Sequence, residues 1–216
     1  MFLSGVSHPC HQRNPRLFRL CDGRQSAWES RQVKANHIAQ NCAKALDWVK
    51  ENTVPEQGVM VSSRRRHPYL EVTGYLIPTL IATGELSLAE QYAEFLAYMQ
   101  REDGAFAGAD GKAYVFDTGQ VLRGLLAATG RWERYRSCAE KAAHYVVSCI
   151  EPNGRIPSRY DYEVPEPIHM YVLPALAEAS RILGKPQYGE AALKALGYYR
   201  TLPNVLNDAI LTHFLA

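Results

Sequence analysis

Acidic side chains stand where apolar stretches of the sequence begin. Asp117 opens "DTGQVLRGLLAATGR", Glu71 opens "EVTGYLIPTLIATGE", and His169 lies at the start of "IHMYVLPALAEASRILGK". Two carboxylates on neighbouring elements can form the acid–base pair that hydrolyses a glycosidic bond, and their separation decides between retaining and inverting hydrolysis. A histidine can carry protons between groups near neutral pH. We therefore take Asp117, Glu71 and His169 as candidate catalytic residues.

The same residues also have structural interpretations. Asp117 stands directly before an expected helix, where it suits an N-cap that accepts N–H bonds from the first turn and meets the positive end of the helix dipole. Glu71 and Glu166 fit the general preference of acids for helix starts. A single histidine such as His169 is more often a structural residue than a proton shuttle. The two roles of Asp117 are compatible only if one carboxylate oxygen stays free.

Basic and aromatic residues near these positions are candidates for substrate binding. The dense basic run at residues 64–67 precedes the first apolar stretch, and arginine binds carboxylates through two parallel hydrogen bonds. Arg123 falls one turn into an apolar stretch, where its charge must face a cavity or a partner such as Asp117 or Glu71. Tyrosine rings stack on sugar faces, although a solvated loop and core positions remain the alternatives for these residues. The candidate substrate-binding residues are Arg64, Arg65, Tyr75, Gln120, Arg123, Tyr160 and Tyr171.

Amphipathic stretches alternate with the apolar ones, and this alternation predicts a repeat of helical hairpins. An amphipathic helix has one face in water, whereas a helix that is apolar all round is expected to be buried on most sides. The pattern therefore predicts an all-α fold with amphipathic helices outside and apolar helices inside. The amphipathic helices are expected within residues 35–54, 86–100, 134–150 and 187–203, and the apolar ones within 70–85, 117–131 and 168–185.

The apolar helices also match one another in sequence. Residues 73–75 (TGY) recur as residues 118–120 (TGQ) 45 positions later, and the pattern Tyr-x-x-Pro-x-Leu from residue 75 recurs from residue 171, 96 positions later. Tyr75, Gln120 and Tyr171 are therefore expected at equivalent places on three successive helices. Pro78 and Pro174 are expected about one turn into their helices, where a missing N–H is tolerated.

The repeat occupies residues 33–216, whereas residues 1–32 form an irregular, basic lead-in. The final stretch "NDAILTHFLA" resembles the start of a further apolar helix, which gives about three and a half hairpins. A partial ring of this kind leaves inner-helix surface exposed. It is expected either to close by dimerising or to be a truncated form of a longer protein.

Composition excludes several classes of function. The formal net charge of +2 is too small to indicate nucleic-acid binding, and no apolar run reaches the length of a membrane span. The five cysteines form no CxxC pair, which argues against a compact zinc site and a disulfide framework and favours a reducing, cytoplasmic location. We expect no metal and no organic cofactor.

The segments "EVTGYLIPTL", "MQREDGAFAG" and "VFDTGQVLRGL" resemble those of the α/α-toroid superfamily. This superfamily includes six-hairpin glycosidases, the helical domain of glucuronyl C5-epimerases, and terpenoid cyclase-like repeats. The stretch "QREDGAF" is similar to the QW-type repeat of terpenoid cyclases, with Phe106 in place of tryptophan, and in that setting Asp103 and Gly104 should form a tight turn. Similar "TGY" and "FDTGQVL" segments occur in uncharacterised bacterial proteins assigned to polysaccharide biosynthesis.

The resemblance implies a protein that acts on or binds an acidic or neutral polysaccharide, with uronate-bearing chains foremost. Glycoside hydrolysis and epimerisation are the expected reactions, with Asp117 and Glu71 as acid and base in hydrolysis and a tyrosine or histidine transferring the proton in epimerisation. The alternative is a non-catalytic helical-repeat module of a polysaccharide biosynthesis system. A terpenoid cyclase or prenyltransferase comes third, because the sequence lacks a DxDD motif.

Overall fold

The computed structural model describes residues 37–64, 67–157 and 166–203. The chain divides into two compact units, residues 1–51 and 52–216. In the first unit the described residues form one helix, 37–51. The predicted lead-in at residues 1–32, the predicted last helix start at 207–216, and the candidate binding residues Arg65 and Tyr160 all lie outside the described residues.

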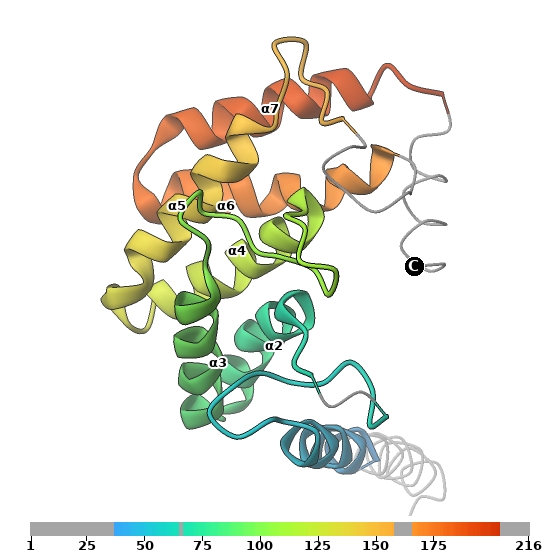
Figure 1. Ribbon diagram of the computed structural model, residues 1–216, viewed down its shortest axis with the longest axis vertical. Helices are drawn as coiled ribbons and strands as arrows, with labels where there is room; N and C mark the ends of the chain where they lie inside the picture. The colour runs from blue at the N-terminus through green and yellow to red at the C-terminus, as the bar shows by residue number, and fades with distance from the viewer. Residues whose placement is uncertain (1–36, 65–66, 158–165, 204–216) are drawn as a thin grey trace, which may run out of the picture. The chain divides into compact units, whose positions relative to one another are not determined.

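The described part of the second unit is helical, which confirms the all-α class (Figure 1). Its only pairing of extended backbone consists of three isolated bridges within the links between helices. No helix among the described residues is both long and apolar enough to cross a membrane. The α-helices are α2 (Leu70–Thr83), α3 (Leu86–Met99), α4 (Val115–Thr129), α5 (Arg136–Ser148), α6 (Leu173–Leu183) and α7 (Pro186–Tyr199), and two 3₁₀ helices, η1 (Glu133–Tyr135) and η3 (Glu166–Val172), precede α5 and α6.

The helices of the second unit pack as two rows. The apolar helices α2, α4 and α6 contact one another in that order, and the amphipathic helices α3, α5 and α7 pack against them. In α4 every side chain is buried except those of Arg123 and Ala127. By contrast, α2 and α6 bury only one side, so the expectation that the apolar helices are buried on most sides is wrong for them. The reason is their position, because α4 has an inner neighbour on each side and they have one each among the described helices.

The Thr-Gly step that recurs in the sequence joins each inner helix to its preceding link. The Thr118 hydroxyl donates to the Tyr114 carbonyl at 2.7 Å and accepts the backbone N–H of Phe106 at 3.0 Å. The Thr73 hydroxyl makes the same pair of bonds, to the Tyr69 carbonyl at 2.7 Å and from the Val59 N–H at 3.2 Å. The repeated threonine therefore fixes the link to the first turn of the helix.

The glycine of the same step lets the next inner segment come close. A Cβ at Gly74 would lie 2.7 Å from the Val121 Cα on α4, and one at Gly119 would lie 2.3 Å from a Val172 methyl group on η3. A Cβ at Gly124 would likewise lie 2.4 Å from the Gly74 carbonyl oxygen. Pro78, two turns into α2 rather than the expected one, has no N–H to offer that carbonyl. The carbonyl instead faces the backbone of α4.

The third inner segment departs from the first two in its backbone. Tyr171 lies in the 3₁₀ helix η3, and the α-helix begins only at Leu173, with Pro174 in its first turn. Proline has no N–H to continue a helix from the preceding turn, but it is well suited to start one. The single helix expected over residues 168–185 is therefore a 3₁₀ segment followed by α6.

Candidate functional site

Glu71, Tyr75, Asp117 and Arg123 form a charged cluster on the inner helices α2 and α4. The Tyr75 hydroxyl is hydrogen-bonded to the Glu71 carboxylate one turn earlier in α2. Burial and the negative charges of Glu71 and Asp117 raise the pKa of Tyr75 above its ordinary value, while Arg123 acts in the opposite direction. Tyr75 is therefore a neutral phenol at physiological pH and donates its proton in a hydrogen bond to the carboxylate.

Asp117 lies inside α4 rather than at its cap. The helix begins at Val115, with Tyr114 as the N-cap, so the predicted N-cap role of Asp117 is wrong by three positions. The turn starts earlier because Val115 and Phe116 are apolar and both become buried in the core. Asp117 still lies in the first turn, where the positive end of the helix dipole favours a negative charge.

The members of the cluster differ in their access to solvent. Asp117 is only 1% exposed, Glu71 and Tyr75 are half-buried, and Arg123 is exposed. The charge of Arg123 was expected to face a cavity or a partner, and it instead reaches solvent while still acting on Tyr75. The accessible groups of the cluster are therefore a carboxylate, a phenol and a guanidinium, with a second carboxylate buried behind them.

Gln120 and Tyr171 continue the row on the inner segments. The Gln120 side-chain amide donates to the Tyr171 carbonyl at 3.5 Å. The rings of Phe116 and Tyr171 meet edge to face, with centroids 6.4 Å apart and planes at 77°. Phe116 was not predicted as a site residue, although its spacing of four from Gln120 places both on one face of α4.

His169 occupies the place that threonine fills in the first two repeats. It lies two residues before Tyr171, as Thr73 and Thr118 lie two before Tyr75 and Gln120, and it interacts with the Pro157 backbone of the preceding link. Burial lowers its pKa to about 4, although the nearby Glu166 acts in the opposite direction. At neutral pH it is an uncharged, buried imidazole.

Glu166, at the start of the third inner segment, is engaged in an ion pair. Arg155 binds its carboxylate through two nitrogens, with Nη2 2.5 Å and Nε 2.9 Å from its oxygens. Paired guanidinium contacts of this geometry hold a carboxylate firmly. The pair connects the two described ends of the third link, residues 157 and 166.

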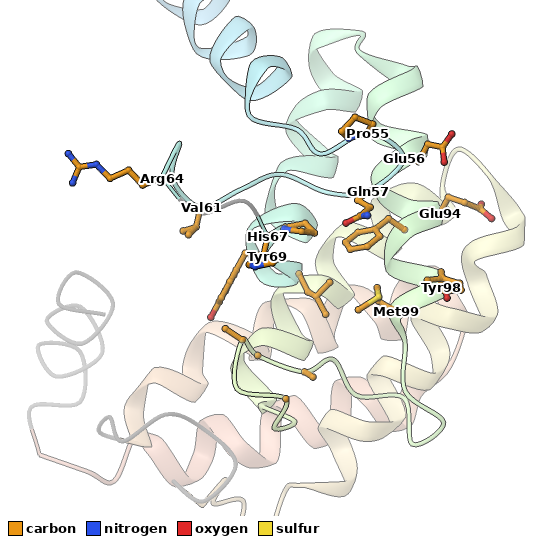
Figure 2. A pocket seen from close by; sticks show the side chains of 17 residues that line it. Pro55, Glu56, Gln57, Val61, Arg64, His67, Tyr69, Glu94, Tyr98 and Met99 are labelled. Carbon is orange, nitrogen blue, oxygen red and sulfur yellow. The ribbon is translucent and has the colours of Figure 1, made fainter.

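A large pocket of the second unit does not include the charged cluster. It has a volume of about 1300 Å³ and lies between the first link, the C-terminal half of α3 and residues 107–111 of the second link. Of the predicted binding residues only Arg64 lines it, and Figure 2 shows the Arg64 side chain directed outward. In the described part of the chain no three His, Cys, Asp or Glu side chains are grouped as metal ligands.

Comparison with known proteins gives one informative likeness. No protein-family model matches the chain, and no curated protein matches it either. Among solved structures the chain is similar to one described as a novel α-amylase from Clostridium perfringens, with a TM-score of 0.54 and 14% sequence identity. The match covers 70% of this chain and 51% of the amylase, so the chain spans about half of that protein. At this identity the likeness shows the fold alone.

Proposed function

We propose that this is a carbohydrate-active protein of the α/α-toroid superfamily and that the charged cluster at Tyr75 is its reactive site. The observation that carries the proposal is the hydrogen bond between Tyr75 and Glu71 on α2, made within the electrostatic reach of Asp117 and Arg123 on the adjacent inner helix α4. Two carboxylates near a hydroxyl donor and a guanidinium are the groups that general acid–base catalysis on a sugar uses. The fold likeness to an α-amylase, itself a glycosidase, supports a carbohydrate substrate.

Hydrolysis is the reaction that we place first. The hydrogen bond from Tyr75 holds the Glu71 carboxylate in place, and in this reaction Glu71 takes a proton from water. Asp117 is a carboxylate in the free protein, so this reaction requires it to take up a proton before catalysis. It gives that proton to the glycosidic oxygen as the bond between that oxygen and the sugar carbon breaks, and the oxygen of water bonds to the carbon. Asp117 is buried, so this step requires the first turn of α4 to open when the substrate enters.

Epimerisation of a uronate is the second candidate reaction, and the access of the cluster to solvent favours it. Arg123 is exposed and can bind the uronate carboxylate as a bidentate fork. Glu71 would remove the proton at C5 and Tyr75 would give its hydroxyl proton to the opposite face, which requires the sugar to enter between them and replace their hydrogen bond. Neither step needs Asp117 to reach the sugar. In this scheme His169 stays a buried positioning residue of the third link.

The alternative to both reactions is a module that binds glycan without turning it over. Replacing Glu71 by Gln keeps its size and removes its charge, and Asp117→Asn does the same at the second carboxylate. An enzyme is expected to lose roughly a hundredfold or more in turnover with each change while oligosaccharide binding is retained. Turnover and a thermal melt with neutral and uronate oligosaccharides measure the two quantities.

The control for these variants is Glu102→Gln, an exposed carboxylate in the turn after α3. Unchanged turnover in both Glu71→Gln and Asp117→Asn would remove the catalytic assignment. A melt that rises with oligosaccharide although no product forms would support the binding module.

The assembly in which this site works is also a proposal. The helices α2 and α6 each leave a side that the described residues do not cover, and the exposed side of α2 includes Ala82 and Thr83. A second copy of the chain could cover these sides and complete the ring. Light scattering on the purified protein tests this, and the proposal requires a dimer.

A further inference from the structure

The pocket outside the charged cluster is a groove with two different walls. Pro55, Glu56 and Gln57 of the first link form one wall, and Glu94, Tyr98 and Met99 of α3 form the other (Figure 2). Its volume of about 1300 Å³ exceeds the roughly 300–1,000 Å³ of most small-molecule sites. The groove is therefore large enough for an extended ligand of several units.

The groove exists because the first turn sits differently from the other two. In the second and third links a glycine packs directly on the next outer helix: a Cβ at Gly104 would lie 2.3 Å from the Lys141 carbonyl, and one at Gly154 would lie 2.5 Å from the Lys194 carbonyl. The first turn has Gln57 at the equivalent position. The side-chain amide of Gln91 on α3 donates to the Gln57 carbonyl at 2.8 Å. A side chain therefore separates this turn from α3.

The same turn contains an unusual backbone conformation. Glu56 has a φ of 59°, and it is the one non-glycine residue with positive φ in the described chain. A residue with a side chain is seldom found in the left-handed region, and strained residues concentrate at binding sites. The conformation places the exposed Glu56 side chain on the rim of the groove.

The opposite wall presents an aromatic ring to solvent. Tyr98 is 85% exposed and Met99 41% exposed, although the equivalent residues after α5 are the small Ser148 and Cys149. A flat ring with a hydroxyl on its edge offers a stacking face and a polar contact together. Glu94 lies one turn before Tyr98 and also lines the groove, but its carboxylate accepts the Tyr135 hydroxyl at 2.9 Å and pairs with Arg134, so it is not a group for the ligand.

We infer that this groove is a second carbohydrate-binding site, which holds a run of neutral hexose rings on Tyr98. Neutral sugars have an apolar face for the ring and hydroxyl donors for a carboxylate such as that of Glu56. A uronate chain fits less well, because its charges would meet the Glu56 carboxylate on the rim while Arg64 is directed away. None of the residues of the Tyr75 cluster lines the groove, so this site is independent of the proposed reaction.

Affinity electrophoresis and calorimetry with linear neutral and uronate oligosaccharides of about six units test the inference. Tyr98→Ala is expected to weaken binding of the neutral oligosaccharide by roughly five- to tenfold, whereas Tyr98→Phe keeps the ring and most of the affinity. Leu193→Ala is the matched control, because Leu193 is a 70% exposed apolar side chain on α7, outside the groove. The melting temperatures of all three variants should equal that of the parent.

The outcomes separate this site from the reactive cluster. Glu71→Gln should retain the groove's affinity, and Tyr98→Ala should retain turnover of a disaccharide. The inference is overturned if no neutral oligosaccharide binds or if Tyr98→Ala binds as the parent does. It is also overturned if Tyr98→Ala converts a dimer into a monomer, because a second copy of the chain would then cover the groove.

Discussion

The second and third inner segments perform the same task with different chemistry. In the second, the Thr118 hydroxyl bonds the link and Gly119 admits the next segment. In the third, His169 interacts with the link and Met170 stands in place of the glycine. Glycine therefore occurs at position 119, where a further inner segment packs closely. Methionine occurs at position 170, where the described residues contain no further inner segment. The contact between an inner segment and its preceding link therefore involves a hydroxyl in one case and an imidazole in the other. Only the imidazole is expected to make the stability of that contact depend on pH.

Adding a methyl group at the closest inner contact should have the largest effect. A Cβ at Gly124 would lie 2.4 Å from the Gly74 carbonyl, so Gly124→Ala forces two backbones apart and should lower the free energy of unfolding by about 3 kcal/mol. Chemical denaturation measures the loss.

Gly197→Ala is the control for that variant. Nothing lies within 4 Å of a Cβ at Gly197 on α7, and alanine is the better helix former by up to about 1 kcal/mol. Equal stabilities for the two variants would show that the close contact between α2 and α4 is not a feature of the folded protein.

His169 should make the stability depend on pH. Its pKa falls from 6.5 to about 4 on folding, so below pH 6.5 the unfolded chain binds a proton that the folded chain does not. The free energy of unfolding should therefore decrease as the pH falls from 6.5 toward 4, by roughly 2 kcal/mol between pH 7 and pH 5. Denaturation curves at the two pH values measure this.

His169→Thr introduces the residue found at the equivalent positions 73 and 118, and it should remove this part of the pH dependence of stability. The control is His144→Gln, which changes an exposed histidine on α5. If His169→Thr keeps the full slope between pH 7 and pH 5, the buried imidazole is not its cause.

Removing the Thr118 hydroxyl, which bonds the second link to α4, should lower the free energy of unfolding by a smaller amount. Thr118→Val keeps the shape of the side chain but leaves the buried N–H of Phe106 without its acceptor, at a cost of about 1–2 kcal/mol. Thr118→Ser retains the hydroxyl and should lose less. A valine variant as stable as the parent would mean that the link is held by other contacts.

The sequence predicted the parts of the fold that depend on local patterns. Hydrophobic periodicity located every described helix of the second unit, and the turn at Asp103 and Gly104 is confirmed by the Asp103 carboxylate, which accepts the Ala105 N–H at 3.1 Å. In the structure Tyr75 is bonded to Glu71 and feels the charges of Asp117 and Arg123, and the assignment of these residues to a site stays a prediction.

The remaining features depend on packing between elements, which periodicity does not encode. The burial of Asp117 follows from the position of α4 between two inner neighbours, and the start of that helix moved because Val115 and Phe116 joined the core. The groove depends on the distance between a turn and α3, which is set by Gln57 and Gln91. The sequence does contain a sign of the groove, because Gln57 stands where the second and third turns have Gly104 and Gly154. This difference is visible only when the three turns are aligned.

The most direct test of the reactive cluster is mass spectrometry of oligosaccharides after incubation with the protein in water enriched in oxygen-18 and deuterium. The account predicts a mass increase in the product, from oxygen-18 at a new reducing end in hydrolysis or from deuterium on a uronate carbon in epimerisation. It also predicts that Glu71→Gln abolishes this increase while Glu102→Gln leaves it intact. Unlabelled oligosaccharides throughout, or labelling that survives Glu71→Gln, would contradict the account.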